Sequence, residues 1–541
     1  MVASSHAEQL YGLCASAARE IHEECTSLLS AGLPNDDAAA SPLVGCGPAL
    51  INLLSRQALQ VRNCYGSLHS THVCSDRLSP DERALILKRL DDIASIAYAK
   101  FYAFLFKDLP VCWRQLYTDA SIVKFCFTIL HTPYVGEYLW VPGHRDSPDD
   151  LDSRKLSELI KILDLAIILA GPAGERRGRR WIDRSLELLH LAWVEDARGD
   201  GGIAFSDRAP KRTELPTNSD GQGLNTNKQH RTTFSTDEPF TPPVRHPIRT
   251  VEALPLEQFQ AYMDRPRDQK LGPEPLVIRH AIDEWPSFNT RPWKDPTYLL
   301  SQTFGGRRLV PVEIGRSYVD EGWGQKLITF GELLESYIDP TLSGTKAEPQ
   351  AAGQSQSPNP PSMAATPVAY LAQHPLFTQL PALRNDIVIP DYCYTLPPPH
   401  PTHPSTDQPE LDEPLLNAWF GPPGTITPLH NDPYHNVLAQ VVGRKYVRLY
   451  SPLETERMYA RGKEGGVEMG NTSLIDVGVV EGWDVAPHND DEASAQPVAA
   501  FKDAPFVDCI LEPGDLLYIP IGWWHYVRGL SVSFSVSFWW N

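Results

Sequence analysis

The chain has 541 residues, of which 42% are hydrophobic, and a formal net charge of −19 at pH 7. This length exceeds that of one ordinary domain and predicts two domains with sizeable cores, joined by irregular segments. The acidic balance argues against direct nucleic-acid binding, which needs a positive surface, and favours the approach of basic protein segments.

The sequence gives no sign of secretion or of membrane insertion. The first six residues lack a basic region followed by an apolar one, so we expect no secretory signal. The most apolar stretch, residues 159–170, is too short to span a bilayer and contains Lys161 and Asp164. Nine cysteines without a Cys-X-X-Cys pair indicate reduced thiols in an intracellular protein.

Residues 1–195 are predicted to form an α-helical domain. Ser79, Pro80 and Glu82 have the N-cap, first-turn proline and third-position glutamate of a helix start. Apolar residues then recur with helical spacing at Ile86, Leu90, Ile93 and Ala97, and again at Ile182, Leu186, Leu189 and Trp193. Paired helices commonly build binding surfaces, so we interpret this domain as a possible protein-interaction module.

Four segments are too polar or too rich in glycine and proline to form a core. Residues 196–247 are predicted to be a flexible linker, and residues 248–541 a second, β-rich domain. Low-complexity insertions are expected near residues 344–367, 397–414 and 454–499. We interpret the last of these as a solvated loop, although it lies between the candidate ligands below and could border their cleft.

Three residues have the chemistry of a metal site. His430 and Asp432 are two positions apart, which on a strand places both side chains on the same face. His525 follows a short apolar run that is predicted to be a further strand. Two imidazoles and a carboxylate can take one face of an octahedral metal and leave the other face for substrates, as in non-haem Fe(II) oxygenases. A His-X-Asp triplet alone is common by chance.

Lys445 is a candidate cation close to these ligands. Gly443 and Arg444 separate two apolar-rich segments and fit a type II′ hairpin turn. Lys445 would then lie on a strand beside the ligand strand, from which its ammonium could reach an acid held on the metal. The alternative for Lys445 is a solvated lysine on an edge strand. A further imidazole, His435, stands at an odd offset from His430, which favours packing over ligation.

The last predicted strand alternates strictly between large apolar residues and serines. Its large residues are Val532, Phe534, Val536 and Phe538, and its serines are Ser531, Ser533, Ser535 and Ser537. In a barrel the small face could border a cavity while the large face packs beneath helices. A half-exposed sheet is the alternative.

Several blocks together resemble the Jumonji-C domain. The blocks are residues 419–432, 443–452 and 534–540, with further similarity upstream at 275–278, 310–318, 370–374 and 389–393. Within that family they are most similar to the subfamily of Jumonji-C domain-containing protein five, described both as an arginyl hydroxylase and as a histone lysine demethylase. The resemblance covers about residues 248–541 and implies an α+β chain whose helical domain precedes a double-stranded β-helix, a cupin-like jelly roll with flanking helices.

The resemblance also implies the site. His430, Asp432 and His525 would bind Fe(II) and form the catalytic centre. The cosubstrate 2-oxoglutarate would be held by Tyr370, Thr427, Asn436 and Lys445. Substrate would be bound by Glu313, Tyr318, Trp323 and Trp419, because a carboxylate among aromatic faces suits a guanidinium.

The implied activity is dioxygenase chemistry, with O2 and 2-oxoglutarate as cosubstrates, that hydroxylates a protein side chain, most readily arginine. The substrate would be a protein or peptide, such as a histone or another basic protein. The alternatives are demethylation of histone methyl-lysine by the same chemistry, a metal-binding barrel that uses no 2-oxoglutarate, and a non-catalytic adaptor acting through the helical domain. The resemblance favours the nucleus over the cytoplasm.

Overall fold

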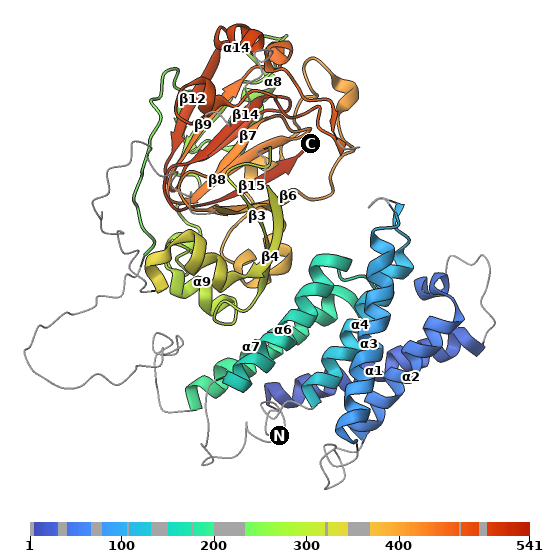
Figure 1. Ribbon diagram of the computed structural model, residues 1–541. Helices are drawn as coiled ribbons and strands as arrows, with labels where there is room; N and C mark the ends of the chain where they lie inside the picture. The colour runs from blue at the N-terminus through green and yellow to red at the C-terminus, as the bar shows by residue number, and fades with distance from the viewer. Residues whose placement is uncertain are drawn as a thin grey trace, which may run out of the picture. The chain divides into compact units, whose positions relative to one another are not determined.

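The computed structural model describes residues 5–30, 41–66, 78–104, 108–130, 150–174, 177–199, 233–319, 323–343, 368–464, 467–485 and 495–541. The chain divides into two compact units, Met1–Leu215 with Arg307–Leu309 and Pro216–Gly306 with Val310–Asn541. One unit is helical and the other is built around β-sheets (Figure 1). The predicted insertion at 344–367 lies outside the described residues.

The described part of the helical unit contains long helices and one short 3₁₀ helix. They are α1 (His6–Ser30), η1 (Pro42–Cys46), α2 (Pro48–Gly66), α3 (Pro80–Phe101), α4 (Val111–Leu130), α6 (Asp150–Ala170) and α7 (Gly178–Gly199). The predicted helix start is confirmed, because Ser79 and Glu82 form a reciprocal capping box at α3. None of the helices in the described part of the chain has both the length and the apolar content of a transmembrane span.

The apolar stripes predicted for this unit face its interior. Ile86, Leu90, Ile93 and Ala97 are all buried on α3, which packs on α4. On α7, Ile182, Leu186 and Leu189 are buried, whereas Trp193 is only half-buried.

Two facing sheets form the second unit. The larger has the order β1-β2-β13-β8-β15-β6-β5-β3-β4, and the smaller has the order β12-β9-β14-β7. The strands of the larger sheet are β1 (Thr250–Glu252), β2 (Leu276–Arg279), β3 (Leu309–Ile314), β4 (Gly324–Thr329), β5 (Ala369–His374), β6 (Leu415–Gly421), β8 (His435–Val442), β13 (Leu516–Ile519) and β15 (Ser533–Trp540). Those of the smaller are β7 (Ile426–His430), β9 (Lys445–Tyr450), β12 (Phe506–Leu511) and β14 (Trp524–Gly529). This arrangement confirms the predicted double-stranded β-helix behind a helical region.

Short helices and one small ribbon complete the second unit. The α-helices are α8 (Leu256–Asp264), α9 (Pro296–Gln302), α10 (Phe330–Glu332), α11 (Leu376–Gln379), α12 (Pro381–Arg384), α13 (Val477–Val480) and α14 (Ala495–Lys502). The 3₁₀ helices are η5 (Pro286–Phe288), η7 (Pro340–Ser343), η8 (Asp391–Tyr394), η9 (Pro404–Thr406) and η10 (Pro452–Met458), and η6 (Leu333–Ile338) is a π-helix. The ribbon pairs β10 (Lys463–Glu464) with β11 (Val467–Glu468).

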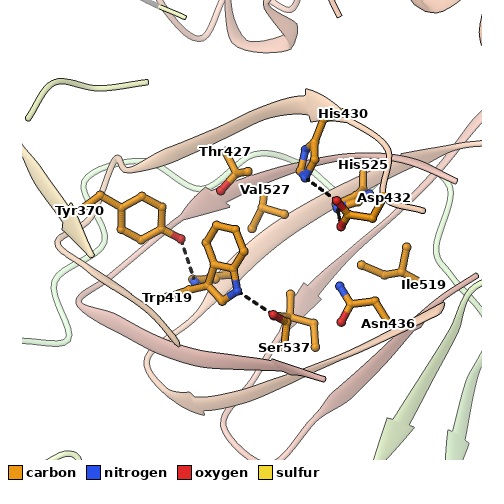
Figure 2. A pocket seen from close by; sticks show the side chains of 12 residues that line it. Tyr370, Trp419, Thr427, His430, Asp432, Asn436, Ile519, His525, Val527 and Ser537 are labelled. Atoms are coloured by element: carbon orange, nitrogen blue, oxygen red, sulfur yellow. Dashed lines mark hydrogen bonds and ion pairs between the residues drawn. The ribbon is translucent and has the colours of Figure 1, made fainter. Parts of the chain in front are cut away.

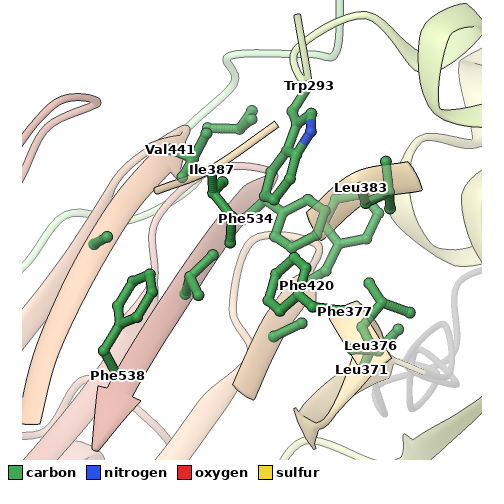
Figure 3. Packing of buried hydrophobic residues seen from close by; sticks show 14 of the residues in the cluster. Trp293, Leu371, Leu376, Phe377, Leu383, Ile387, Phe420, Val441, Phe534 and Phe538 are labelled. Atoms are coloured by element: carbon green, nitrogen blue, oxygen red, sulfur yellow. The ribbon is translucent and has the colours of Figure 1, made fainter. Parts of the chain in front are cut away.

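A large aromatic core lies behind the larger sheet. Phe534 of β15 stacks on Trp293 with ring centroids 4.5 Å apart and on Phe420 of β6 at 4.6 Å. Phe377 of α11 stacks on the same indole at 5.8 Å (Figure 3). β15 runs between β8 and β6, so its large residues join the two halves of this sheet.

Both faces of β15 are buried, so the alternative of a half-exposed strand is wrong. Val532, Phe534, Val536 and Phe538 belong to the aromatic core, as the large face was expected to do. On the opposite face, Ser537 lines the pocket described below. The alternation in the sequence therefore predicted that one face of this strand packs in a core and that the other face borders a pocket.

The predicted linker is wrong at both of its described ends. Residues 196–199 continue α7, and residues 233–247 pack on the sheet unit, while 200–232 lie outside the described residues. Phe234 is 4% exposed in the aromatic core. The backbone N–H groups of Arg245 and His246 donate to the buried Asp508 carboxylate of β12. One aromatic ring and a few backbone donors anchor a segment whose composition is otherwise that of a solvated loop.

The expected solvated loop at 454–499 is also largely wrong. Met458, Ile475 and Val477 are buried in a second apolar cluster beneath the smaller sheet. The polar composition of this stretch conceals these few anchoring residues. The insertion at 397–414 is mainly surface-exposed as predicted, but it is tied down where Leu411 N donates to the side chain of Asn541.

Candidate metal centre and adjoining pocket

The structure brings the three predicted metal ligands together. His430 ends β7, and His525 on the neighbouring strand β14 lies directly opposite it in the ladder. The Asp432 carboxylate is 3.8 Å from His430 Nε2 and 3.5 Å from His525 Nε2. One ligand atom from each side chain lies within 4.8 Å of the others, as a single metal ion requires.

We predicted that Asp432 lies on the same strand as His430, but it does not. β7 ends at His430, and Asp432 stands in the connection to β8. The backbone N–H of Gly522 donates to the carbonyl oxygen of Asp432 at 3.3 Å, which anchors this connection to the turn before β14. The two-residue spacing therefore brings the ligands together without a continuous strand.

Hydrogen bonds orient both imidazoles with Nε2 toward the centre. His430 Nδ1 is 2.8 Å from the carbonyl oxygen of Pro428, and His525 Nδ1 is 3.0 Å from that of Trp523. A carbonyl only accepts, so each Nδ1 carries the proton and each Nε2 is left with its lone pair. Figure 2 shows the three ligands gathered at one end of the pocket.

The protonation states also suit a metal. Burial, helped by the neighbouring His525, lowers the pKa of His430 to about 4, so this imidazole is neutral at pH 7. Burial by itself would raise the pKa of Asp432, but the two imidazoles hold it below its usual value. Metal ligands must be deprotonated, and the pKa shifts of His430 and Asp432 both favour that form at pH 7. The donor set therefore fits a divalent ion such as Fe(II).

Lys445 supplies a buried cation in the same pocket. It begins β9, which pairs with β14, and it is 1% exposed. Its Nζ donates to the hydroxyl of Tyr370 at 3.3 Å, and within the described residues no carboxylate pairs with it. Burial lowers the pKa of Lys445 to about 7. A buried amine without a counter-charge fits an anionic ligand, and the solvated-lysine alternative is wrong.

The predicted hairpin before Lys445 is wrong. Gly443 and Arg444 join β8 to β9, but these strands lie in opposite sheets rather than side by side. The glycine is still needed, because Gly443 has φ +65° and a Cβ there would lie 1.9 Å from the carbonyl oxygen of Val532. The same glycine signal fits a crossing between sheets as well as a hairpin.

The other residues expected to bind 2-oxoglutarate line this pocket too. Tyr370 of β5, Thr427 of β7 and Asn436 of β8 share it with the metal ligands and Lys445. Burial raises the pKa of Tyr370, and a hydrogen bond from Thr427 partly opposes this, so the two hydroxyls are in contact. The buried Asn436 Oδ1 has no hydrogen-bond partner, an unmet acceptor that a ligand in the pocket would satisfy.

The four predicted substrate residues are placed differently from one another. Trp419 lines the pocket, and its Nε1 donates to Ser537 Oγ at 2.9 Å (Figure 2). Glu313 of β3 is paired with Tyr370 in the ladder, which puts both side chains on the same face of the sheet.

The remaining two substrate candidates lie near Glu313 and the metal ligands. Burial raises the pKa of Glu313, and a hydrogen bond with Trp323, an indole that is 37% exposed, partly opposes this rise. The Tyr318 hydroxyl is 3.3 Å from Thr472 Oγ1. Burial raises the pKa of Tyr318, and the negative charge of Asp432 adds to this effect.

Several pocket residues were not among the predicted site residues. They are Leu438, Ile519, Val527 and Ser537. The alternation of the last strand pointed to Ser537, whereas the three apolar residues carry no sequence signal that distinguishes them from core. Thr472, from the stretch expected to be a solvated loop, pairs with His430 in the ladder.

His435 has the packing role that we favoured. Its Nδ1 lies 2.9 Å from the Tyr518 hydroxyl, and its Nε2 lies 2.9 Å from the carbonyl oxygen of Pro398. Both ring nitrogens are therefore engaged away from the metal centre. Burial lowers the pKa of His435 to about 4.

The chain is similar to several known proteins. Residues 265–541 match the family model of the cupin-like domain. The chain is 36% identical over 436 residues to Jumonji C domain-containing protein 5 of Drosophila melanogaster, which covers 81% of this chain and 82% of the fly protein.

Two other relatives are matched over narrower regions. Lysine-specific demethylase 8 of Danio rerio is 38% identical over 56% of this chain and 64% of its own length. The human bifunctional peptidase and (3S)-lysyl hydroxylase JMJD7 is 22% identical over 52% of this chain and 83% of its own length. This chain therefore belongs to the cupin-like Jumonji-C family.

Proposed function

We propose that this protein is an Fe(II)- and 2-oxoglutarate-dependent dioxygenase that hydroxylates a side chain of another protein, with arginine as the first candidate. The observation that carries the proposal is one pocket in which His430, Asp432 and His525 stand near the unpaired ammonium of Lys445. A metal-ligand triad alone would serve several chemistries, but a buried cation beside it specifies an acidic cosubstrate.

The residues of the pocket divide into two binding roles. His430, Asp432 and His525 would hold Fe(II), while Lys445, Tyr370, Thr427 and Asn436 would hold the carboxylates and keto group of 2-oxoglutarate. When bound, these groups supply the oxidising power, because oxidative decarboxylation of 2-oxoglutarate by O2 gives succinate and CO2 and drives hydroxylation of a nearby C–H bond.

The protein's own task is to orient these groups and to keep water out. Nδ1–H bonds to backbone carbonyls fix both imidazoles, so the ligand face is preorganised. Leu438, Ile519 and Val527 form an apolar wall of the pocket. A dry site strengthens the pairing of Lys445 with a carboxylate and protects a reactive intermediate from side reactions.

The arginine preference is supported by the side chains near the metal end. Glu313 is half-buried, burial raises the pKa of its carboxyl group, and a guanidinium bound beside it would favour the charged form. Tyr318, Trp323 and Trp419 offer aromatic faces on which a planar guanidinium stacks. A basic substrate segment also suits the formal net charge of −19.

Demethylation of a histone methyl-lysine is the second candidate function. It is supported by the relative named a lysine-specific demethylase, and aromatic faces suit a methylated ammonium as well. The same hydroxylation on an N-methyl group would release formaldehyde. Nuclear rather than cytoplasmic residence belongs to this proposal and stays a prediction.

The first experiment is succinate formation by purified protein with Fe(II), ascorbate and 2-oxoglutarate. Arginine-containing and methyl-lysine-containing peptides of matched sequence are added separately. We expect the arginine peptide to stimulate turnover and to gain one oxygen atom by mass spectrometry. Formaldehyde from the methyl-lysine peptide, with no oxygen gain on the arginine peptide, would reverse the order of the two candidates.

Two other hypotheses predict different results when residues of the pocket are substituted. An adaptor would retain partner binding and full biological rescue after His430→Ala, because its function would reside in the helical unit. A metal-binding barrel that does not use 2-oxoglutarate would leave turnover unchanged after Lys445→Ala. The present proposal requires both substitutions to abolish turnover.

Binding of 2-oxoglutarate is expected to weaken as pH rises above 7. The pKa of Lys445 is about 7, so above this pH the buried amine is neutral, whereas a bound carboxylate favours the ammonium. Binding at pH 8 must therefore take up a proton. Calorimetry of the Mn(II)-loaded protein in two buffers of different ionisation enthalpy measures this uptake.

Lys445→Arg is the matched control for the pH effect. A guanidinium stays protonated across this range, so this variant is expected to bind 2-oxoglutarate without proton uptake. Equal uptake by both proteins would assign the proton to another group and contradict the role given to Lys445.

A further inference from the structure

The segment between the two histidine ligands covers the exposed edge of the ligand strand. β7 is the outer strand of the smaller sheet, and Thr472 pairs with its last residue, His430. The backbone N–H of Asn431 also donates to the carbonyl oxygen of Asn471 at 2.9 Å. We call residues 471–484 the cover segment, since its first residues bridge the free edge of β7.

One carboxylate at the end of the cover segment binds two arginines from different parts of the sheet unit. Asp484 accepts two hydrogen bonds from Arg528, at 2.7 and 3.0 Å, and one from Arg316 at 3.0 Å. Arg528 lies on β14, three residues after His525. Arg316 lies two residues before Tyr318 and also pairs with Asp476 of the cover segment.

The chain around Arg316 and the cover segment meet again next to the metal centre, beside β7. The Tyr318 hydroxyl is 3.3 Å from the Thr472 hydroxyl, and Thr472 pairs with His430. The backbone N–H of Ile426, at the start of β7, donates to the carbonyl oxygen of Arg316 at 3.3 Å. The chain that carries Tyr318 is therefore held between β7 and the cover segment.

We infer that Asp484 is a positioning residue that sets the location of Tyr318 and the adjoining cover segment, and through them the alignment of the substrate side chain. This inference deepens the proposed function and rests on it. Asp484 is only 13% exposed, so its charge is matched by the two guanidiniums rather than by water. Removing the charge would remove the carboxylate that joins Arg528 to Arg316 and would release the segment that carries Tyr318.

Asp484 itself does not contact the acid-binding end of the pocket within the described residues. Lys445 donates to the Tyr370 hydroxyl there, whereas the side chain of Asp484 bonds Arg316 and Arg528. His525 is held by the backbone pairing of β14 with both β9 and β7, which does not depend on Asp484. Loss of the carboxylate should therefore separate substrate alignment from cosubstrate binding.

The test is Asp484→Asn, which keeps the shape of the side chain and removes its charge. We expect the KM for the substrate peptide to rise, or the yield of hydroxylated product per succinate to fall. The combined loss from the two effects should be about 10- to 100-fold, as for a misplaced substrate. The Kd for 2-oxoglutarate, measured on the Mn(II)-loaded protein, should change by less than about twofold. Equal losses in peptide and 2-oxoglutarate binding would overturn the inference.

Two control variants separate positioning from general damage. Glu481→Gln alters the same segment, but Glu481 pairs with Arg448 and Arg245 rather than with Arg316. Asp503→Asn removes an exposed carboxylate outside the network. Both should keep the wild-type yield of product per succinate. A Glu481→Gln defect as large as that of Asp484→Asn would mean that packing of the segment, and not its link to Tyr318, controls alignment.

Hydrogen exchange followed by mass spectrometry tests the inference without any substrate. Asp484→Asn should speed exchange in residues 315–318 and 471–476, while β9 and β15 keep wild-type protection. Unchanged exchange in both segments would overturn the inference. If the wild type shows no turnover with any peptide, the proposed function fails, whereas the exchange result still decides what Asp484 positions.

Discussion

Replacing His430 by alanine is expected to lower peptide-stimulated succinate formation by more than about 100-fold, since partners that merely orient a metal ligand are already worth about 10- to 100-fold. His430 faces His525 across the β7–β14 ladder, and its Nε2 is one of three ligand atoms within 4.8 Å of one another. With one imidazole gone, His525 and Asp432 offer two ligands, too few to hold the ion at the proposed site. The measurements are succinate yield and bound metal per protein.

His435→Gln is the matched control for this loss. His435 is as deeply buried as His430, but its ring nitrogens contact Tyr518 and Pro398. Its replacement should cost about 1 kcal/mol for each hydrogen bond that glutamine fails to restore, and should lower the melting temperature. Metal content should stay at the wild-type level. Loss of metal in this variant as well would mean that the metal site depends on the whole β7–β8 region rather than on the triad.

Deletion of residues 533–541 is expected to unfold the sheet unit. β15 pairs with β8 on one side and β6 on the other, so its loss divides the larger sheet in the middle. It also removes Phe534 from its stacks on Trp293 and Phe420. Truncating one such buried ring, as in Phe534→Ala, should cost about 3–5 kcal/mol. Domains are stable by only about 5–15 kcal/mol, so loss of the whole strand exceeds what the fold can tolerate.

Circular dichroism and denaturant titration measure both changes. The control is deletion of Asn541 alone, whose side chain bonds only the exposed segment around Leu411, Gln408 and Pro409. That deletion should leave the unfolding midpoint close to that of the wild type. A cooperative, native-like transition after removal of the whole strand would contradict the central role of β15.

The triad was predictable from sequence because its chemistry restricts the residue types. Few structural roles require the set His430, Asp432 and His525. The third ligand can stand far away in the sequence, because a loop of any length can connect the strands. The path of the chain around them was harder to predict. Asp432 proved to lie beyond the end of β7, and Gly443 turned between sheets rather than within a hairpin. Local spacing fixes which side chains meet, but not which sheet each strand joins.

The cover segment was missed for a different reason. Its stretch of the sequence is polar, and its attachment depends on a few scattered side chains such as Ile475, Val477 and Asp484. Taken alone, none of these residues indicates an ordered segment. Their anchoring role is apparent only from their partners in other elements. The same holds for Phe234 in the predicted linker. Composition averages over a window, whereas anchoring requires only one or two residues in it.

The strand pairing has a consequence for how fast the protein reaches its native state. β13 joins β2 by pairing Leu516 with Ile278, and the ligand pair His430 and His525 also meets across a long stretch of chain. Pairings between residues so distant in sequence give a high contact order, which slows folding because chain entropy is lost before the contacts form. Insertions between strands add only a logarithmic cost to each loop closure. We therefore expect this strand order to make refolding slow, with metal bound only in the last phase.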